Sequence, residues 1–293
     1  MLETAILDMP GVAFSPLNHV CFSPDGTFLA ASSVDREVAV FRGSEIVYQS
    51  NFQTEDHRLR PLDSVRSLVF SADSQFLYVA AGDMLRRISL YNGTEQWARQ
   101  ADPNMVFLIT TPVALARSGL GQVACAYADG RVELYDGAGE LERSWTHNSS
   151  PCLIGYLSGN RLVGTDRFTI GVWNSSGKLV DKAKGTQRMF ALAASEVSDL
   201  VAVRSLHEVL ILRTSDWQPV GRSATQAGYP KLEFISGDQL VSLDLTGFSV
   251  LDDNGAEVRR VDTPLYRPIG LNYSSLHGLA VSGSDGAVHI YPM

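Results

Sequence analysis

The sequence predicts an all-β protein in which seven four-stranded antiparallel sheets form a closed ring. Three observations predict it: a repeat, strand-like apolar runs within each repeat, and a spare strand at one end that matches a missing strand at the other. The residues that end the third apolar run of each repeat are Phe41, Tyr91, Tyr135, Trp173, Leu212, Leu251 and Tyr291. Their spacings are 50, 44, 38, 39, 39 and 40 residues, and a period near forty is typical of a β-propeller.

The first three strands of each repeat are apolar and are joined by tight turns. In the first repeat, residues 20–26 read as a strand with a Pro-Asp-Gly turn, and 28–33 and 37–41 read as the second and third strands. Proline presets φ and glycine admits positive φ, so this tripeptide suits a chain reversal. No window longer than ten residues has helical periodicity, so we expect no helix of ordinary length.

The fourth strand of each repeat is shorter and more polar. The segments that we assign to it in the first four repeats are 45–48, 95–97, 140–145 and 178–180. A polar outer strand beside three apolar strands describes a propeller blade, because the outer edge of a blade faces water.

The two ends of the chain complement each other. Residues 3–7 read as a strand that precedes the first repeat, and the last repeat stops at Met293, directly after its third strand. An open ring would leave unpaired backbone groups and an exposed apolar face. We therefore expect the N-terminal strand to complete the seventh blade, and residues 1–293 to form one seven-bladed propeller.

The repeats resemble the WD40-repeat propeller family across nearly the whole chain. The resemblance is carried by the turn Phe22-Ser23-Pro24-Asp25-Gly26, by the strand-ending aromatic residues and by aspartates in equivalent turns. These aspartates are Asp35, Asp83, Asp129 and Asp285. A side chain that caps its own turn explains all four of them.

The chain also departs from the family pattern. No Gly-His pair opens a repeat and no Trp-Asp pair closes one, and the turn aspartate is missing at Leu206-His207 and Leu245-Thr246. We therefore expect the family's Asp–His–Ser/Thr–Trp network to be incomplete in every blade, with stability resting on strand packing. The resemblance implies a non-catalytic scaffold for protein–protein interactions.

An enzyme is the alternative function. The third and fourth repeats also resemble the repeats of quinone-dependent dehydrogenase propellers, which leaves open a hydrolase, a lyase or a quinone-dependent oxidoreductase with its site at the channel mouth. Catalytic motifs are weak, however. The segment 155–159 has its serine one place late for a nucleophile elbow, and Asp252-Asp253-Asn254-Gly255 reads better as a β-turn than as a calcium loop. We expect no metal or cofactor.

Composition restricts the class of partner and the compartment. The net charge of −8 and the pI of about 5.2 make nucleic-acid binding an unfavoured prediction. No apolar stretch is long enough to span a membrane, and the N-terminal residues lack the features of a secretion signal. The three cysteines, Cys21, Cys125 and Cys152, have neither disulfide nor zinc-site spacing. We expect a cytoplasmic protein.

The partner is expected to bind the connections that lead from one blade to the next. Formal charges in the six such connections sum to +4, against −8 for the chain, so we expect an acidic protein or peptide to bind a mildly basic rim. The long connections 49–64 and 98–112 are expected contact elements. The predicted partner-binding residues are His57, Arg58, Arg60, Met105, Phe107, His147, Arg188, Tyr229, Tyr266 and Arg267. The predicted function is that of a monomeric scaffold subunit in a cytoplasmic multiprotein complex.

Overall fold

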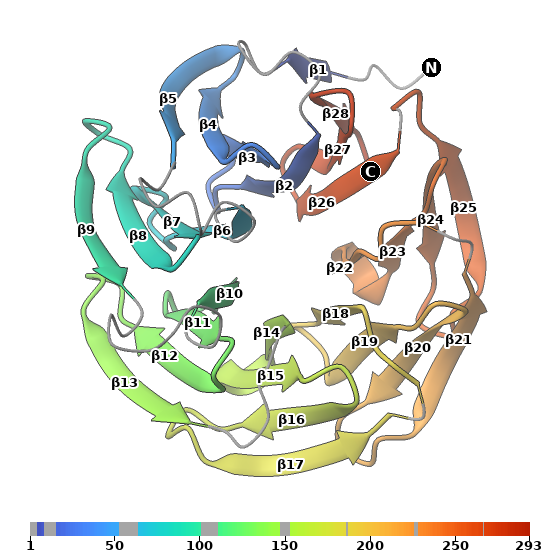
Figure 1. Cartoon of the computed structure of the whole chain (residues 1–293). Helices are drawn as coiled ribbons and strands as arrows, with labels where there is room; N and C mark the ends of the chain where they lie inside the picture. Colours follow the sequence, from blue (N-terminus) through green and yellow to red (C-terminus); the bar gives the residue numbers. More distant parts are fainter. Residues whose placement is uncertain are drawn as a thin grey trace.

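Seven blades surround a central opening in the computed structural model (Figure 1). The structure describes residues 5–8, 16–52, 64–100, 111–146, 153–185, 187–225, 228–265 and 267–293. Each blade is a four-stranded antiparallel sheet, as predicted from the repeat. Within the described ranges the chain forms strands and two short 3-10 helices, and it contains no helix that is long and apolar enough to cross a membrane.

In the first six blades the strands run in sequence order from the axis outward, and in the seventh blade β1 is the outer strand. The inner strands are β2 (Leu17–Phe22), β6 (Val65–Phe70), β10 (Pro112–Arg117), β14 (Leu153–Leu157), β18 (Ala191–Ala194), β22 (Leu232–Phe234) and β26 (Pro268–Ser274). The second strands are β3 (Leu29–Ser33), β7 (Phe76–Ala81), β11 (Val123–Tyr127), β15 (Arg161–Thr165), β19 (Leu200–Arg204), β23 (Leu240–Leu243) and β27 (Gly278–Gly283).

The third and outer strands complete the blades. The third strands are β4 (Glu37–Arg42), β8 (Met84–Ser89), β12 (Arg131–Tyr135), β16 (Thr169–Trp173), β20 (Glu208–Arg213), β24 (Gly247–Leu251) and β28 (Ala287–Tyr291). The outer strands are β5 (Glu45–Asn51), β9 (Glu95–Gln100), β13 (Leu141–Thr146), β17 (Leu179–Lys184), β21 (Pro219–Ala224), β25 (Glu257–Asp262) and β1 (Ala5–Asp8).

Burial follows the predicted order of the strands. Every residue of the second strands β3 and β11 is buried, whereas the outer strand β13 is exposed along almost its whole length. Alanine and valine dominate the second strands because neighbouring sheets pack face to face there and leave little room for larger side chains. The hydrophobic core is therefore a series of interfaces between successive blades.

The N-terminal strand closes the ring. β1 pairs antiparallel with β28 in the seventh blade, with Ala5 opposite Ile290 and Leu7 opposite Val288. This confirms the prediction that the first strand completes the last blade, with the strand one residue later than expected at its C-terminal end. The blade therefore joins the two ends of the chain, and its outer edge is formed by a segment remote in sequence.

One residue in each third strand fills the space beside the preceding blade. In the first six blades this residue pairs with the outer strand, and the pairing changes register between this residue and the one before it. The residues at this position are Phe41, Ile88, Tyr135, Trp173, Leu212, Leu251 and Tyr291.

The prediction that Tyr91 holds this position in the second blade is wrong. Ile88 is opposite Leu77, as Phe41 is opposite Leu29, and Ile88 is fully buried. Tyr91 lies in the following turn, where 97% of its surface is exposed. By subtraction, the first two spacings are then 47 residues each, so the connections before the second and the third blade contribute equally to the longer repeats.

Side-chain hydrogen bonds link the inner strands of neighbouring blades. Asn18 Nδ2 donates to the carbonyl of Val65 at 2.8 Å, and the Leu115 N–H donates to Ser67 Oγ at 3.1 Å. Asn272 accepts a hydrogen bond from the Phe22 N–H at 2.8 Å. These bonds fix the inner strands of adjacent blades at one height along the axis.

The aspartates in the turns between second and third strands form more than one kind of hydrogen bond. Asp129 and Asp285 accept hydrogen bonds from N–H groups two residues ahead, as predicted. Asp83 instead accepts a bond from Gln100 Nε2 in the outer strand. In the first blade Ser33 Oγ accepts the Asp35 N–H, so a residue at the start of the turn also acts as a cap.

We predict that removal of β1 strongly destabilises the ring. Deletion of residues 1–8 would remove four paired positions along β28, and at about 1 kcal/mol for each lost hydrogen bond the free energy of unfolding should fall by roughly 3–5 kcal/mol. Thermal denaturation followed by circular dichroism measures the effect. Deletion of residues 1–4 is the control, and equal melting temperatures for the two truncated proteins would contradict a closing role for β1.

Candidate functional site

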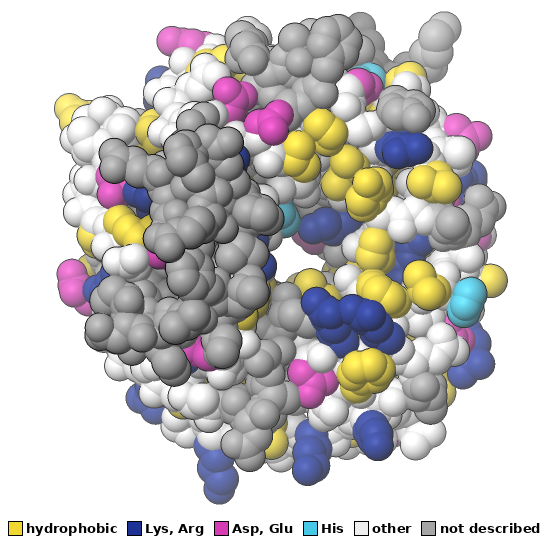
Figure 2. Space-filling model, viewed as in Figure 1, with side chains coloured by type: hydrophobic (Ala, Val, Ile, Leu, Met, Phe, Trp, Pro, Cys, Tyr) yellow, Lys and Arg dark blue, Asp and Glu magenta, His cyan; other side chains and the backbone are white. Residues whose placement is uncertain are grey.

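The candidate site is the face of the ring that carries the connections between blades. In four-stranded antiparallel blades, these connections and the turns between second and third strands emerge on the same side, which we name the loop face. Figure 2 shows this face, with hydrophobic and basic side chains gathered beside the central opening over the fifth to seventh blades. Loops held on a rigid scaffold are where recognition residues concentrate.

Three of the predicted partner-binding residues lie in the described part of this face. Arg188, Tyr229 and Arg267 are exposed and stand shortly before β18, β22 and β26, so three successive blades present them. The other predicted residues lie outside the described ranges: His57, Arg58, Arg60, Met105, Phe107, His147 and Tyr266.

The turns between second and third strands add exposed apolar side chains that sequence reasoning missed. Val34, Phe168, Leu206 and Leu245 are 43%, 53%, 63% and 45% exposed, and Tyr229 nearby is 45% exposed. A single apolar residue in a turn has no periodicity that would mark it in the sequence. A usable signal was present, however, because Leu206 and Leu245 lie where the expected turn aspartate is missing.

The basic rim is narrower than the charge count predicted. Arg222 pairs with Glu208 at 3.5 Å, and Arg260 is held by Asp244 and Asp262. Lys182, Lys184 and Arg188 form no ion pair with another described residue. Lys182 and Lys184 lie in the outer strand β17 rather than in a connection, so the exposed cations of the described connections are Arg188 and Arg267.

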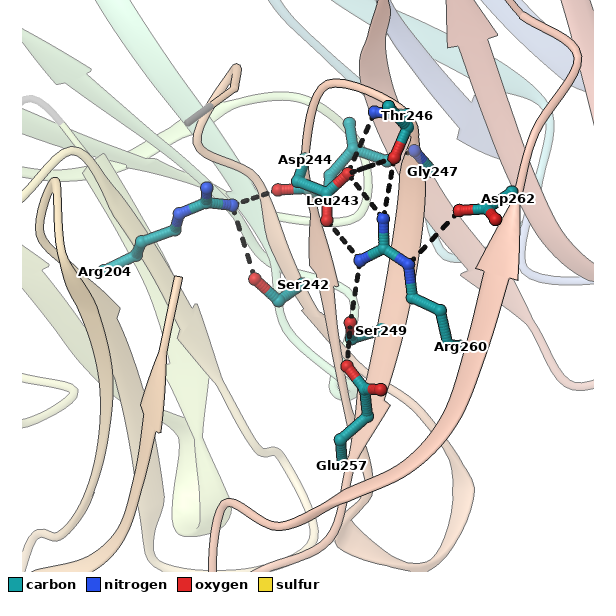
Figure 3. A network of polar contacts seen from close by, with 10 residues as sticks. All are labelled: Arg204, Ser242, Leu243, Asp244, Thr246, Gly247, Ser249, Glu257, Arg260 and Asp262. Carbon is teal, nitrogen blue, oxygen red and sulfur yellow. Dashed lines mark hydrogen bonds and ion pairs between the residues drawn. The ribbon is translucent and has the colours of Figure 1, made fainter. Parts of the chain in front are cut away.

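A polar network built on Asp244 supports the loop face in the sixth blade (Figure 3). Asp244 Oδ1 accepts hydrogen bonds from the N–H groups of Thr246 and Gly247, at 2.9 and 3.1 Å, and it also binds the Arg260 guanidinium. Arg260 in turn donates to Ser249 Oγ at 3.1 Å, and Ser249 donates to Glu257. Leucine stands at the expected aspartate position, as predicted, but the turn keeps a cap because Asp244 supplies it from one residue earlier.

Burial and hydrogen bonding act in opposite directions on Asp244. Burial raises the pKa of its carboxyl, but the hydrogen bonds from Arg260 and from the turn N–H groups outweigh it and hold the pKa below its ordinary value. Arg204 of the fifth blade extends the network by donating to Ser242 Oγ and the Leu243 carbonyl. We interpret this network as structural, because its charged side chains already form hydrogen bonds or ion pairs with other residues of the network.

The axial channel contains a carboxyl group, that of Glu233, whose pKa is raised to near neutrality. A cavity of about 510 Å³ is lined by inner-strand residues of all seven blades. Burial raises the pKa of Glu233 to about 7, against hydrogen bonds from the Tyr273 N–H and Asn272 and the attraction of Lys231. Asn272 Nδ2 donates to Glu233 Oε1 at 3.1 Å. Burial and repulsion from Lys231 lower the pKa of His19.

The weak catalytic motifs have structural roles. Ser158 Oγ donates to Asp199 Oδ1 at 2.9 Å and so links the fourth blade to the fifth. Asp252 Oδ1 accepts the N–H groups of Asn254 and Ala256, as expected for a β-turn. Among the described residues, no group of three or more His, Cys, Asp or Glu side chains is arranged to hold a metal ion.

Comparisons with known proteins agree with the predicted resemblance. The sequence model of the family described as "WD domain, G-beta repeat" matches residues 12–42, which hold the first blade up to its third strand. Among solved structures, a chain in the "Crystal Structure of Mitotic Checkpoint Complex" is similar with a TM-score of 0.75 and 17% identity, covering 100% of this chain and 92% of that chain. No curated protein matches by sequence. The first repeat and the seven-bladed ring together confirm the resemblance to WD40 propellers.

We predict that Arg260→Ala destabilises the protein by about 2–4 kcal/mol at neutral pH, because Asp244 then keeps a buried charge without its cation. The low pKa of folded Asp244 stabilises the protein above the unfolded pKa, and this contribution disappears as the pH falls through the folded value. The difference from wild type should therefore shrink below about pH 4. Urea denaturation across pH measures it. The half-buried neighbour Arg259→Ala is the control, and equal losses for both variants would contradict the assigned role.

We predict that Glu233→Gln stabilises the protein at pH 8 but not at pH 5. The raised pKa means that folded Glu233 retains a proton which the unfolded chain has released, so stability declines as pH rises from about 4.5 to 7. One pKa unit corresponds to about 1.4 kcal/mol, and we expect a gain of roughly 1–3 kcal/mol for the variant at pH 8. Melting temperatures measured from pH 5 to 8 test this. Parallel curves for the two proteins would show that Glu233 ionises normally.

Proposed function

We propose that this WD40-type seven-bladed propeller is a non-catalytic scaffold that binds protein partners through its loop face, as a monomeric subunit of a cytoplasmic multiprotein complex. The observation that carries the proposal is the set of exposed apolar side chains on the turns of that face. Phe168, Leu206, Tyr229 and Leu245 project from four separate connections held by three consecutive blades. Exposed apolar groups that converge on one surface are characteristic of interaction sites.

The composition of the loop face supports a protein partner. Arg188 and Arg267 are exposed, and the guanidinium carbon of Arg188 lies 5.1 Å from the centre of the Phe190 ring. Arginine and aromatic residues dominate the binding energy of protein interfaces. The net charge of −8 opposes a nucleic-acid partner. The similar chain in the mitotic checkpoint complex is part of a multiprotein assembly, which supports the same type of role here.

The cytoplasmic part of the proposal rests on the thiols. Cys21 and Cys125 are buried and unpaired, and burial raises the pKa of both. Free buried thiols are usual in proteins that fold under reducing conditions.

A second candidate function, an enzyme acting in the axial channel, is favoured by one observation. Glu233 has a pKa of about 7 and could exchange a proton near neutral pH. Asn272 and the Tyr273 N–H form hydrogen bonds with Glu233, and the charges of Lys231 and Glu196 act on it. A bound small molecule that co-purifies with the wild type but is lost in Glu233→Gln would favour this candidate over the scaffold.

We predict that acidic substitutions on the loop face abolish partner binding. A variant with Leu206→Glu, Tyr229→Glu and Leu245→Glu should lose at least about 90% of each stoichiometric partner, because a buried apolar contact is replaced by an unpaired charge. Affinity purification of the tagged protein from its native cell, followed by quantitative mass spectrometry, measures the recovery.

The opposite face provides a matched control. Leu120, Val197 and Leu276 are 81%, 90% and 65% exposed in the turns between first and second strands. A variant with these three residues changed to glutamate has the same charge change and removes more exposed apolar surface than the loop-face variant. Equal partner recovery by both triple variants would exclude the loop face, and absence of stoichiometric partners from the wild type would exclude the scaffold function.

A further inference from the structure

The axial channel holds more hydrogen-bond donors than its own residues satisfy. Its cavity of about 510 Å³ is lined by all seven blades. Figure 2 looks into the channel from the loop face, and basic side chains border the central opening there. Ionisable side chains of the first, third, fifth and sixth blades act on one another in the channel. They are His19, Arg117, Glu196, Lys231 and Glu233.

The two carboxylates of the channel already accept hydrogen bonds from the protein. Glu233 Oε1 accepts the side-chain amide of Asn272 at 3.1 Å, and the Tyr273 N–H donates to the same carboxyl group. Glu196, which lies just after β18, accepts a hydrogen bond from the Gly119 backbone. Both acids are therefore provided with donors from neighbouring blades.

The two cations of the channel have no such partners. Arg117 ends β10 and Lys231 directly precedes β22, so they come from the third and the sixth blade. Both are partly exposed, and neither side chain forms a hydrogen bond or an ion pair with a described residue. Burial lowers the pKa of both groups, against the attraction of Glu196 and Glu233 respectively. A cation that is withdrawn from water without a bonded anion is destabilised, and a bound anion would relieve this.

His19 adds a third donor from the first blade. It lies in β2, and its ring forms no hydrogen bond with the part of the chain that the structure describes. Burial and repulsion from Lys231 lower its pKa, so the imidazole is neutral at physiological pH and carries one N–H group. Three blades thus present donors without acceptors, whereas both acids of the channel are bonded. Buried polar groups are usually satisfied, so an excess of one kind indicates a missing partner of the other kind.

We propose that the axial channel binds a small organic anion, whose carboxylate or phosphate oxygens accept hydrogen bonds from Arg117, Lys231 and His19. Such an anion supplies both the acceptors and the negative charge that these side chains lack. A guanidinium group binds carboxylate or phosphate through two parallel N–H bonds. The cavity volume is within the range of small-molecule sites. The proposal goes beyond the scaffold function, does not depend on it and requires no chemical step.

Isothermal titration calorimetry at low ionic strength tests the proposal. The probes are succinate, citrate, inorganic phosphate and sulfate. We expect one anion per chain and a Kd below about 1 mM for at least one probe, with weaker binding when chloride is added. Tighter binding of succinate and citrate than of phosphate and sulfate assigns the ligand to the carboxylates, and the reverse order assigns it to the phosphates.

Variants of the two cations locate the bound anion. Arg117→Met and Lys231→Met should each weaken the tightest probe about tenfold or more, because each removes a charge-assisted hydrogen bond. Both should melt no lower than wild type without ligand, because an apolar side chain replaces an unpaired cation. Lys178→Met removes an exposed lysine just before the outer strand β17 and should leave binding unchanged. Circular dichroism confirms the fold of each variant.

The pH dependence of binding gives an independent location. Burial raises the pKa of Glu233 to about 7, and the titratable groups that act on it are Lys231, Glu196 and Cys21. Burial raises the pKa of the Cys21 thiol, so it stays protonated. Succinate and sulfate remain dianions between about pH 6.5 and 8.5. As Glu233 ionises over this range, it repels a nearby anion, and the affinity should fall at least about twofold. In Glu233→Gln the affinity should stay constant.

The outcomes decide the proposal. It is overturned if no probe binds saturably below about 5 mM, or if both channel variants bind as tightly as wild type. An equal loss in Lys178→Met would show that the anions neutralise surface charge in general, and this result also overturns it. A wild-type affinity that does not fall with pH would place the anion away from Glu233 and contradict the assigned site. The enzyme candidate expects its small molecule to be lost in Glu233→Gln, whereas this proposal expects that variant to bind the anion at every pH.

Discussion

Closure of the ring is the constraint on which the rest of the structure depends. Each blade buries one face against the blade before it and the other against the blade after it, so no blade completes its core alone. The pairing of β1 with β28 is what supplies the outer edge of the seventh blade and joins the two ends of the chain. Ring closure thereby turns seven marginal sheets into one continuous series of buried interfaces.

The two faces of the ring are used differently as a result. On the face opposite the loops, short turns bond to their neighbours, as Asp25 does to Ser74, Ser158 to Asp199 and Ser198 to Asp238. These contacts hold the blades together where the inner strands end. The loop face has the longer connections and the exposed apolar turns. Its sequence is therefore freer to vary, and this freedom makes it the natural place for recognition.

Irregular positions in the repeat carry most of the information on function. Leu206 and Leu245 lie at positions where aspartate was expected, and both are exposed. Asp244 takes over the capping of its turn and recruits Arg260, so this turn keeps its shape while it presents an apolar side chain. An apolar side chain can therefore be exposed for binding at this turn without loss of the turn's structure.

The sequence by itself determined the seven-bladed all-β architecture and the closure of the ring, because strand periodicity, turn residues and the matching ends are local properties of the chain. It also placed Arg188, Tyr229 and Arg267 in connections between blades. Only the tertiary structure decided the features that depend on contacts between residues distant in the sequence. Ile88 rather than Tyr91 fills its junction because strand register is set across the sheet, and Arg260 is neutralised because a carboxylate 16 residues away folds beside it.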